Sequence, residues 1–279
     1  MNRICFNGKI TAGEEPVLLA SNRGYRYGDG LFETIKVIKG RIVSAPYHFE
    51  RLFDGLLVLK FEIPRLFTRE KLEQQILQLC DKNDCRELGR VRVSVFRGNG
   101  GLYDENKTLQ YIIECWPLDE SANKLNDNGL LIDIYPDAAK SCDKFSNLKS
   151  ANFLPYFMAA AFAKENKLND CLVINTKGGI ADSTIANIFL VKDGMITTPA
   201  LDEGCVNGVM RRHLVTVLRE AGYKVQETAV STNDIKDAGE IFLTNAINGI
   251  RWVRQFRDTR YTNTKTVEIY NRFIQTIFP

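Results

Sequence analysis

The chain has 279 residues, which is long for one domain and sufficient for two. It is 44% hydrophobic and 25% charged, as in ordinary globular proteins, and its formal net charge is only +3. Because no Lys- or Arg-dense segment stands out, the sequence does not indicate nucleic acid as a partner. No run approaches about 18 apolar residues, so no membrane span is predicted. The N-terminal MNRICFNGKI also lacks the apolar run of a signal peptide.

The cysteines are odd in number and scattered, at Cys5, Cys80, Cys85, Cys115, Cys142, Cys171 and Cys205. They form no C-x-x-C pair, and neither His48 nor His213 stands at ligand spacing from a cysteine pair, so no metal site is predicted. An unpaired set of this kind is typical of reduced thiols, which predicts a cytoplasmic location.

The first part of the chain predicts strands, then helices, then strands again. Helices are expected from Pro46 and from the N-cap Thr68, because apolar residues recur at helical spacing after each. Lys39-Gly40 is expected to turn one strand into the next as a hairpin. The predicted strands are residues 4–9, 16–20, 31–38, 41–44, 90–96 and 109–115, the last two around the glycine loop 98–101.

A polar, turn-rich segment, PLDESANKLNDN, covers residues 117–128 and predicts a domain boundary. We therefore expect an N-terminal domain over 1–117, a linker over 118–128 and a C-terminal domain over 129–279. The second domain is predicted to contain strands 130–135, 171–175, 186–191, 195–198, 224–230 and 241–244, and helices 151–163 and 209–221. The expected fold class is α/β (α+β) with two lobes, a small N-terminal α/β domain and a larger mixed-sheet domain.

Several short elements suit a phosphorylated ligand that reacts with an amine. GCVNGVMR at 204–211 is a glycine-rich approach to a helix, whose exposed N–H groups attract phosphate. Arg51 offers a guanidinium fork, and Thr244-Asn245 ends a predicted strand. Lys149 lies among apolar residues, where burial lowers an amine pKa and creates a nucleophile. Each element alone is more typical of ordinary structure, and only the set in this order indicates a function.

Six stretches carry a family resemblance: RGYRYGDGLFETIKV at 23–37, HFERL at 48–52, NLKSANFL at 147–154, IADSTIANIFLVKDG at 180–194, GVMRRHL at 208–214 and IFLTNAINGI at 241–250. In sequence and order they resemble the class IV aminotransferases, the fold type IV pyridoxal-phosphate enzymes. That family includes branched-chain aminotransferases, D-amino acid aminotransferases and 4-amino-4-deoxychorismate lyases. The similarity runs from about residue 20 to about residue 255 and implies pyridoxal 5'-phosphate as the cofactor.

The resemblance also implies roles for individual residues. The lysine that forms the Schiff base with the cofactor falls on Lys149. The contacts to the cofactor's phosphate fall on Arg51, on the backbone amides of Val209 and Met210, and on Thr244 or Asn245. An aromatic-acidic pair near the cofactor falls on Phe32-Glu33 with Tyr27 close by, and Tyr27, Glu33 and Arg97 are the candidate substrate contacts.

One position departs from the family's pattern. The glutamate that pairs with the pyridine nitrogen, five residues before Asn-Ile-Phe, is replaced by Asp182. Aspartate is shorter by one methylene, but its carboxylate still serves as an anionic partner that keeps the ring electron-withdrawing. The flanking Ser183 and Asn187 are expected to help orient it.

The reaction is harder to predict than the cofactor. Asn152 follows Lys149 by three residues, as in the lyases and the D-amino acid enzymes, which argues against a branched-chain aminotransferase. The D-amino acid enzymes clamp the substrate carboxylate with arginine and histidine after the R-G loop, where this chain has Leu102 and Asp104. RGNGG at 97–101 and TNA at 244–246 resemble the lyases, although the arginine usual after that loop is missing.

The resemblance therefore favours 4-amino-4-deoxychorismate lyase, which releases 4-aminobenzoate and pyruvate in folate biosynthesis. The alternatives are an aminotransferase for D- or branched-chain amino acids and a cofactor-binding homologue without turnover. In each case the expected partner is a small amino substrate, and the resemblance implies a homodimer.

Overall fold

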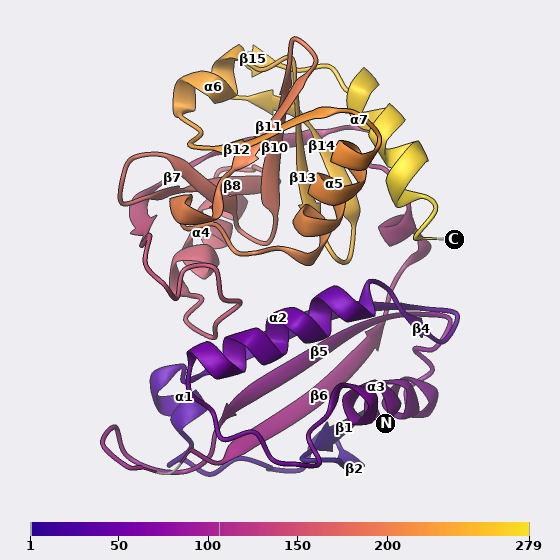
Figure 1. The fold of residues 1–279 in the computed structure, drawn as a ribbon, viewed down its shortest axis with the longest axis vertical. Coiled ribbons are helices and arrows are strands. Elements are labelled where there is room, and N and C mark those ends of the chain that lie inside the picture. Colours follow the sequence, from indigo (N-terminus) through magenta and orange to yellow (C-terminus); the bar gives the residue numbers. More distant parts are fainter. Residues whose placement is uncertain (1, 106, 279) are drawn as a thin grey trace. The chain divides into compact units, whose positions relative to one another are not determined.

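The computed structural model describes residues 2–105 and 107–278, and its contacts divide the chain into two compact units. The first unit comprises Met1–Ala122 with Leu148–Asn152, and the second comprises Asn123–Asn147 with Phe153–Pro279. Each unit combines one β-sheet with helices (Figure 1), so the prediction of a mixed α/β protein is confirmed. The segment 148–152, which carries Lys149, groups with the first unit by its contacts, although the sequence places it within 129–279.

The first unit is a six-stranded antiparallel sheet in the order β2-β1-β6-β5-β3-β4. Its elements are β1 (Arg3–Phe6), β2 (Lys9–Ala12), α1 (Arg23–Tyr27), β3 (Gly30–Ile38), β4 (Arg41–Ile42), α2 (Ala45–Val58), α3 (Arg69–Lys82), β5 (Leu88–Arg97) and β6 (Leu109–Pro117). Strands β3, β5 and β6 pair over almost their whole length and form the centre of the sheet.

Helices α2 and α3 cover one face of this sheet (Figure 1). Alternate residues of β5 (Val91, Val93 and Val95) are buried beneath them, because successive strand residues point to opposite faces. Helix α2 contributes Phe49, Leu52 and Leu56 to the same core, at the helical spacing that the sequence predicts. The N-cap Thr68 accepts a hydrogen bond from the backbone N–H of Lys71 at the start of α3, as expected.

Two predictions about the N-terminal segment are wrong. Residues 4–9 are not one strand, because Asn7 and Gly8 both have positive φ (48° and 88°) and turn β1 back into β2. Residues 16–20 form no strand, and Pro16, which lacks an N–H, cannot donate to a sheet. Helix α1 lies where the sequence predicts only a loop, and Asn22 caps it by accepting from the N–H of Tyr25.

The second unit contains a mixed nine-stranded sheet, in the order β12-β11-β10-β13-β14-β7-β8-β9 with β15 added beside β14. Its elements are β7 (Leu130–Lys140), α4 (Leu154–Glu165), β8 (Asp170–Asn175), β9 (Ile180–Ser183), β10 (Asn187–Lys192), β11 (Met195–Pro199), α5 (Val209–Glu220), β12 (Lys224–Thr228), α6 (Thr232–Asp237), β13 (Glu240–Asn245), β14 (Gly249–Phe256), β15 (Thr259–Arg260), α7 (Thr264–Ile269) and the π-helical turn η3 (Tyr270–Ile274). Strand β7 runs parallel to both of its neighbours, which makes the sheet mixed.

Several strands of this sheet are buried on both faces. Strands β8, β9, β10 and β13 are buried along nearly their whole length, which explains the apolar runs within β8, β10 and β13. Phe189 of β10 stacks on Phe242 of β13 with ring centroids 5.0 Å apart. These buried strands provide a rigid base for the polar side chains at their ends.

Helix α4 begins at Leu154, three residues later than predicted. Pro155 lies in its first turn, where its missing N–H has no acceptor to lose. Residues 150 and 151 are held in extended structure instead, because Ser150 bridges Leu31 and the N–H of Ala151 donates to the carbonyl of Gly30. Over the part of the chain that is described, no helix is long and apolar enough to cross a membrane.

Candidate functional site

Strand β3 and helix α2 bring an acidic, an imidazole and a guanidinium group together in the first unit. Glu33 lies on the face of β3 that α2 covers, and His48 and Arg51 are one helical turn apart on α2. Glu33 Oε1 accepts from Arg51 Nε at 2.8 Å, and Glu33 Oε2 lies 2.6 Å from Arg51 Nη2 and 2.7 Å from His48 Nδ1. Glu33 is 2% exposed and His48 is 0% exposed, so these bonds form away from bulk water.

The charges of this cluster follow from its burial. Burial alone would raise the pKa of Glu33, but the Arg51 guanidinium and the bond to His48 outweigh it and hold this pKa at about 2. Burial lowers the pKa of His48, the bond and charge of Glu33 offset this only in part, and the cations Arg51 and Lys149 lower it further. Glu33 is therefore a carboxylate and His48 a neutral imidazole at neutral pH.

Lys149 lies beside the same strand. Its carbonyl accepts from the N–H of Phe32, and its Nζ lies 4.5 Å from the centre of the Phe32 ring. An ammonium against an aromatic face gains a cation–π contact while its stem stays in apolar surroundings. The structure thus pairs Arg51 with Glu33 and places Lys149 beside the neighbouring residue Phe32, where its charge still acts on His48.

The other two candidates of the first unit lie elsewhere. Tyr27 ends α1 and is 41% exposed. Arg97 is held by protein groups: its guanidinium bonds to the carboxylate of Asp29 and the carbonyl of Leu59, and it lies 4.2 Å from the centre of the Phe61 ring. Arg97 therefore shapes the start of the 98–101 loop in this structure.

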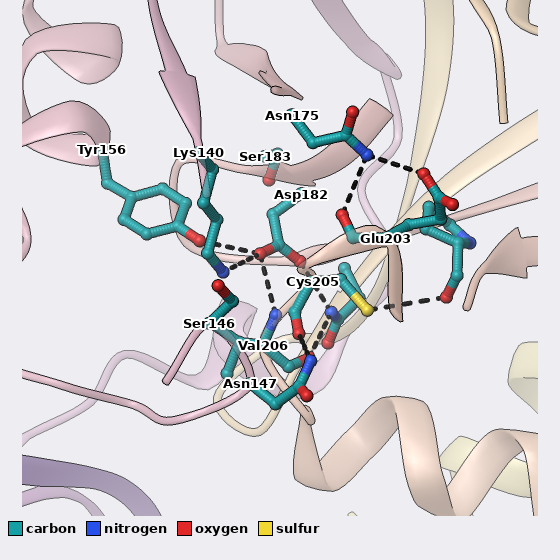
Figure 2. A network of polar contacts seen from close by, with 12 residues as sticks. Lys140, Ser146, Asn147, Tyr156, Asn175, Asp182, Ser183, Glu203, Cys205 and Val206 are labelled. Atoms are coloured by element: carbon teal, nitrogen blue, oxygen red, sulfur yellow. Dashed lines mark hydrogen bonds and ion pairs between the residues drawn. The ribbon is translucent and has the colours of Figure 1, made fainter. Parts of the chain in front are cut away.

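In the second unit, Asp182 of β9 is the centre of a polar network (Figure 2). Its Oδ2 accepts from Lys140 Nζ at 3.1 Å, from the Tyr156 hydroxyl at 2.8 Å and from the Val206 N–H at 3.0 Å. Its Oδ1 accepts from Asn187 Nδ2 at 2.8 Å. The side chains of Lys140 and Asp182 are 12% and 3% exposed, so this is an ion pair largely removed from water.

This network fills most of the acceptor capacity of the carboxylate, which offers about four lone-pair positions. Burial raises the pKa of Tyr156 well above its ordinary value, and the charge of Asp182 raises it further. The phenol therefore stays protonated and donates a hydrogen bond to Asp182. Asn187 orients Asp182 as the sequence predicts, whereas Ser183 Oγ donates to the carbonyl of Ala186 instead. Lys140 and Tyr156 were not predicted, because no motif marks them and their partner is distant in the chain.

The start of helix α5 has the features that suit an anion. Gly208 is the N-cap and supplies no side-chain acceptor, and the first turn has no acidic residue. The N–H groups of that turn, which include those of Val209 and Met210, have no intrahelical acceptor. Asn187 Nδ2 also donates to the carbonyl of Val206 at 2.8 Å and so fixes the loop that leads into the helix.

The predicted phosphate partners after β13 shape a turn. The Thr244 hydroxyl donates to the carbonyl of Gly249 at 2.7 Å. Asn245 Oδ1 accepts from the N–H groups of Ile247 and Asn248 at 3.0 and 2.9 Å. Both side chains therefore hold the hairpin between β13 and β14 in its conformation.

We expect Gly208→Ala to weaken both the fold and the anion site. A Cβ at this position would lie 1.9 Å from Asn187 Oδ1, and Asn187 cannot yield without losing its bonds to Asp182 and Val206. The expected loss is about 1–3 kcal/mol of unfolding free energy, as for other overpacked sites. Chemical denaturation measures this loss. The control is Gly239→Ala, whose added Cβ would meet only an ordinary contact at 3.5 Å. Equal stability of the two variants would contradict the close approach.

Comparison with known proteins adds independent information. Residues 30–256 match the family model for amino-transferase class IV. The chain is 26% identical to D-alanine aminotransferase of Bacillus licheniformis, over 87% of this chain and 84% of the relative. It is also 26% identical to aminodeoxychorismate lyase of Vibrio harveyi, over 82% and 83%.

Solved structures share the fold of the whole chain. The branched-chain aminotransferase of the thermophilic archaeon Thermoproteus uzoniensis is similar with a TM-score of 0.88 at 18% identity, covering 99% of this chain and 95% of that one. A branched-chain amino acid aminotransferase solved with pyridoxamine 5'-phosphate is similar with a TM-score of 0.89 at 19% identity, covering 99% and 94%. The family match over residues 30–256 also includes most of the site residues described above. The chain therefore belongs to the class IV aminotransferases, a family of enzymes that use pyridoxal phosphate.

Proposed function

We propose that this chain is a pyridoxal-phosphate-dependent 4-amino-4-deoxychorismate lyase that releases 4-aminobenzoate and pyruvate, a step of folate biosynthesis. The observation that carries the proposal is the loop after Arg97, where a D-amino acid aminotransferase would need cations to clamp its substrate. Leu102 is apolar and 59% exposed. Asp104 accepts the N–H of Gly101 at 2.7 Å, and its carbonyl accepts from Arg23 Nη1 at 3.1 Å. A leucine and an aspartate cannot bind a carboxylate at those two positions.

The residues present fit the cofactor. Its phosphate requires positive charge and N–H donors. Within the first unit Arg51 is a candidate for the charge, and within the second unit the first turn of α5 offers the N–H groups of Val209 and Met210. Its aldehyde requires an amine, which Lys149 supplies. The buried His48 Nε2, which has no hydrogen-bond partner among residues 2–105 and 107–278, is a further polar atom in the Arg51 cluster. When bound, the cofactor supplies an electron sink for the bond that breaks in the substrate.

The remaining roles in the proposed reaction belong to this chain's own side chains. Lys149 Nζ would hold the aldehyde of the cofactor, and its amine would carry protons to and from the substrate carbon atoms. Asp182 provides the anionic partner of the pyridine nitrogen and forms an ion pair with Lys140. Thr244 and Asn245 support the phosphate through the turn that they fix, while Tyr27, Glu33 and Arg97 remain the substrate-side candidates.

A paired assay tests the proposal. We expect the cofactor-loaded protein to release pyruvate and 4-aminobenzoate from aminodeoxychorismate without any keto acid. We expect no amino transfer from D-alanine to 2-oxoglutarate. Turnover that depends on a keto-acid acceptor would instead establish an aminotransferase, which is the second candidate because a D-alanine aminotransferase and a lyase are both 26% identical to this chain. A protein that stays colourless with added cofactor would support a homologue without turnover.

The proposal also covers the cellular compartment and the oligomeric state of the enzyme. We propose that it works in the cytoplasm as a homodimer on a small amino substrate. The seven cysteines are free thiols, and Cys142 is the one among them that is not buried, which suits a reducing compartment. Light scattering that gives the mass of a single chain at micromolar concentration would contradict the dimer.

A further inference from the structure

We infer that Glu33 and His48 are a positioning pair for Arg51: they hold its guanidinium in one orientation and so give the chain its preference for a phosphorylated ligand. This inference rests on the proposed function, in which Arg51 binds the cofactor's phosphate. It changes the role of Glu33, which the family resemblance places near the substrate. Both residues would act through Arg51 and not on the reacting atoms.

The first support is the geometry of the Arg51–Glu33 pair. A free arginine side chain has several rotatable bonds and loses much of its entropy when it binds an anion. Here Glu33 accepts side-on from Nε at 2.8 Å and from Nη2 at 2.6 Å, which fixes the plane of the guanidinium. The guanidinium of Arg51 is therefore already fixed in orientation before a phosphate binds, so phosphate binding costs less side-chain entropy.

The second support is His48. A carboxylate held on one side only could rotate about its last bond and release the guanidinium. His48 Nδ1 lies 2.7 Å from Glu33 Oε2, on the oxygen that also accepts from Arg51 Nη2. Because buried His48 is neutral, this short contact to a carboxylate requires the proton on Nδ1, which donates to Glu33. His48 therefore fixes the orientation of the Glu33 carboxylate, which in turn fixes the guanidinium of Arg51.

The third support is the charge that surrounds the imidazole. The charged groups that act on His48 are the carboxylate of Glu33 and the cations Arg51 and Lys149, which leaves an excess of one positive charge. His48 Nε2 is fully buried and has no partner among residues 2–105 and 107–278. Burial is the largest cause of the lowered pKa of His48, and the charges of Arg51 and Lys149 lower it further. A phosphate dianion near Arg51 would oppose this added repulsion, so its binding would raise the pKa of the imidazole. Phosphate binding should thus be coupled to proton uptake by His48.

The decisive experiment compares pyridoxal phosphate with pyridoxal, which has the same aldehyde and ring but no phosphate. Both react with a lysine amine, so the same visible absorption change reports both equilibrium affinities. We expect the wild type to prefer pyridoxal phosphate strongly, and Glu33→Gln and His48→Gln each to reduce the ratio of the two affinities about tenfold, the size of one charge-assisted hydrogen bond. Affinity for pyridoxal should stay within about twofold, because the phosphate is the only part concerned.

The matched control is His213→Gln, which removes the other histidine of the chain. His213 lies on α5, burial lowers its pKa as it does for His48, and its Nε2 is likewise buried without a hydrogen bond among the described residues. We expect His213→Gln to keep the wild-type ratio. A purely structural role of Glu33 and His48 would lower both affinities or the stability together and leave their ratio unchanged, which would overturn the inference.

A second measurement requires no change at the pair itself. Because the chain has only two histidines, ¹⁵N imidazole spectra of wild type and His213→Gln assign His48 directly. We expect the proton of His48 on Nδ1 in the free protein and a rise of the pKa of His48 when pyridoxal phosphate is added, but not when pyridoxal is added. A proton on Nε2, or equal spectra with both ligands, would overturn the inference. If the wild type formed no visible band with either aldehyde, the proposed function would fail; a normal band with unchanged ratios in the variants would reject the positioning pair alone.

Discussion

Lys149→Ala is expected to abolish the visible absorption band of the cofactor-loaded protein and to lower turnover about 10³-fold or more. The lysine amine both holds the cofactor aldehyde and moves protons in the proposed reaction, and alanine offers neither function. The first unit should remain folded, because the backbone bond from the Phe32 N–H to the carbonyl of residue 149 does not depend on the side chain. Absorption spectra and the paired assay on the same preparation measure both effects.

The matched control for this prediction is Lys144→Ala. Lys144 is an exposed lysine five residues earlier in the chain, so it tests whether any loss follows from removing a positive charge nearby. We expect wild-type spectrum and turnover from it. An unchanged band in Lys149→Ala would show that another amine holds the cofactor and would reject the assignment of Lys149.

Asp182→Asn should affect stability and catalysis together. The change removes the carboxylate that faces Lys140 Nζ at 3.1 Å and leaves that ammonium, which is 12% exposed, without its charge partner. Breaking one side of a buried ion pair costs about 3 kcal/mol or more. Because the proposed anion at the pyridine nitrogen is also lost, we expect kcat to fall about 10²-fold while cofactor affinity falls less.

The double variant separates these two effects. Adding Lys140→Met to Asp182→Asn removes the stranded charge, so most of the lost stability should return while kcat stays low. Denaturation curves and kinetics of the two single variants and the double variant complete the cycle. The surface pair Lys192–Asp237, which is 54% and 64% exposed, provides the comparison: Asp237→Asn should change stability by less than about 0.5 kcal/mol. Wild-type kinetics in Asp182→Asn would show that the ring nitrogen has another partner.

The sequence alone predicted most of the regular elements in the interior. Runs of strand-forming residues predicted β3, β5 and β6, and apolar residues at helical spacing predicted α2, whose apolar stripe packs on the core. It failed where local backbone geometry decided the outcome. The Asn7-Gly8 turn and the later start of α4 each depend on one or two residues, and the spacing of apolar residues does not predict either feature.

The candidate site divides in the same way. Family motifs singled out Lys149, Arg51 and Asp182, because their chemistry follows from residue type and local context. They did not reveal that Glu33 is bonded to Arg51 and His48, nor that Lys140 and Tyr156 bind Asp182. Those contacts join residues 15 to 42 positions apart.

Residue type and order by themselves determined the family and its cofactor chemistry, and they singled out Lys149 as the candidate nucleophile. Only the tertiary structure decided which donor meets which carboxylate. The physical reason is that a buried charge needs a partner at hydrogen-bond distance, and that distance is set by the order of strands in a sheet and by the face that a helix presents. The strand order and the helix face both depend on residues far apart in the chain. The chemistry of an amine, a guanidinium or a carboxylate depends only on the residue that carries it.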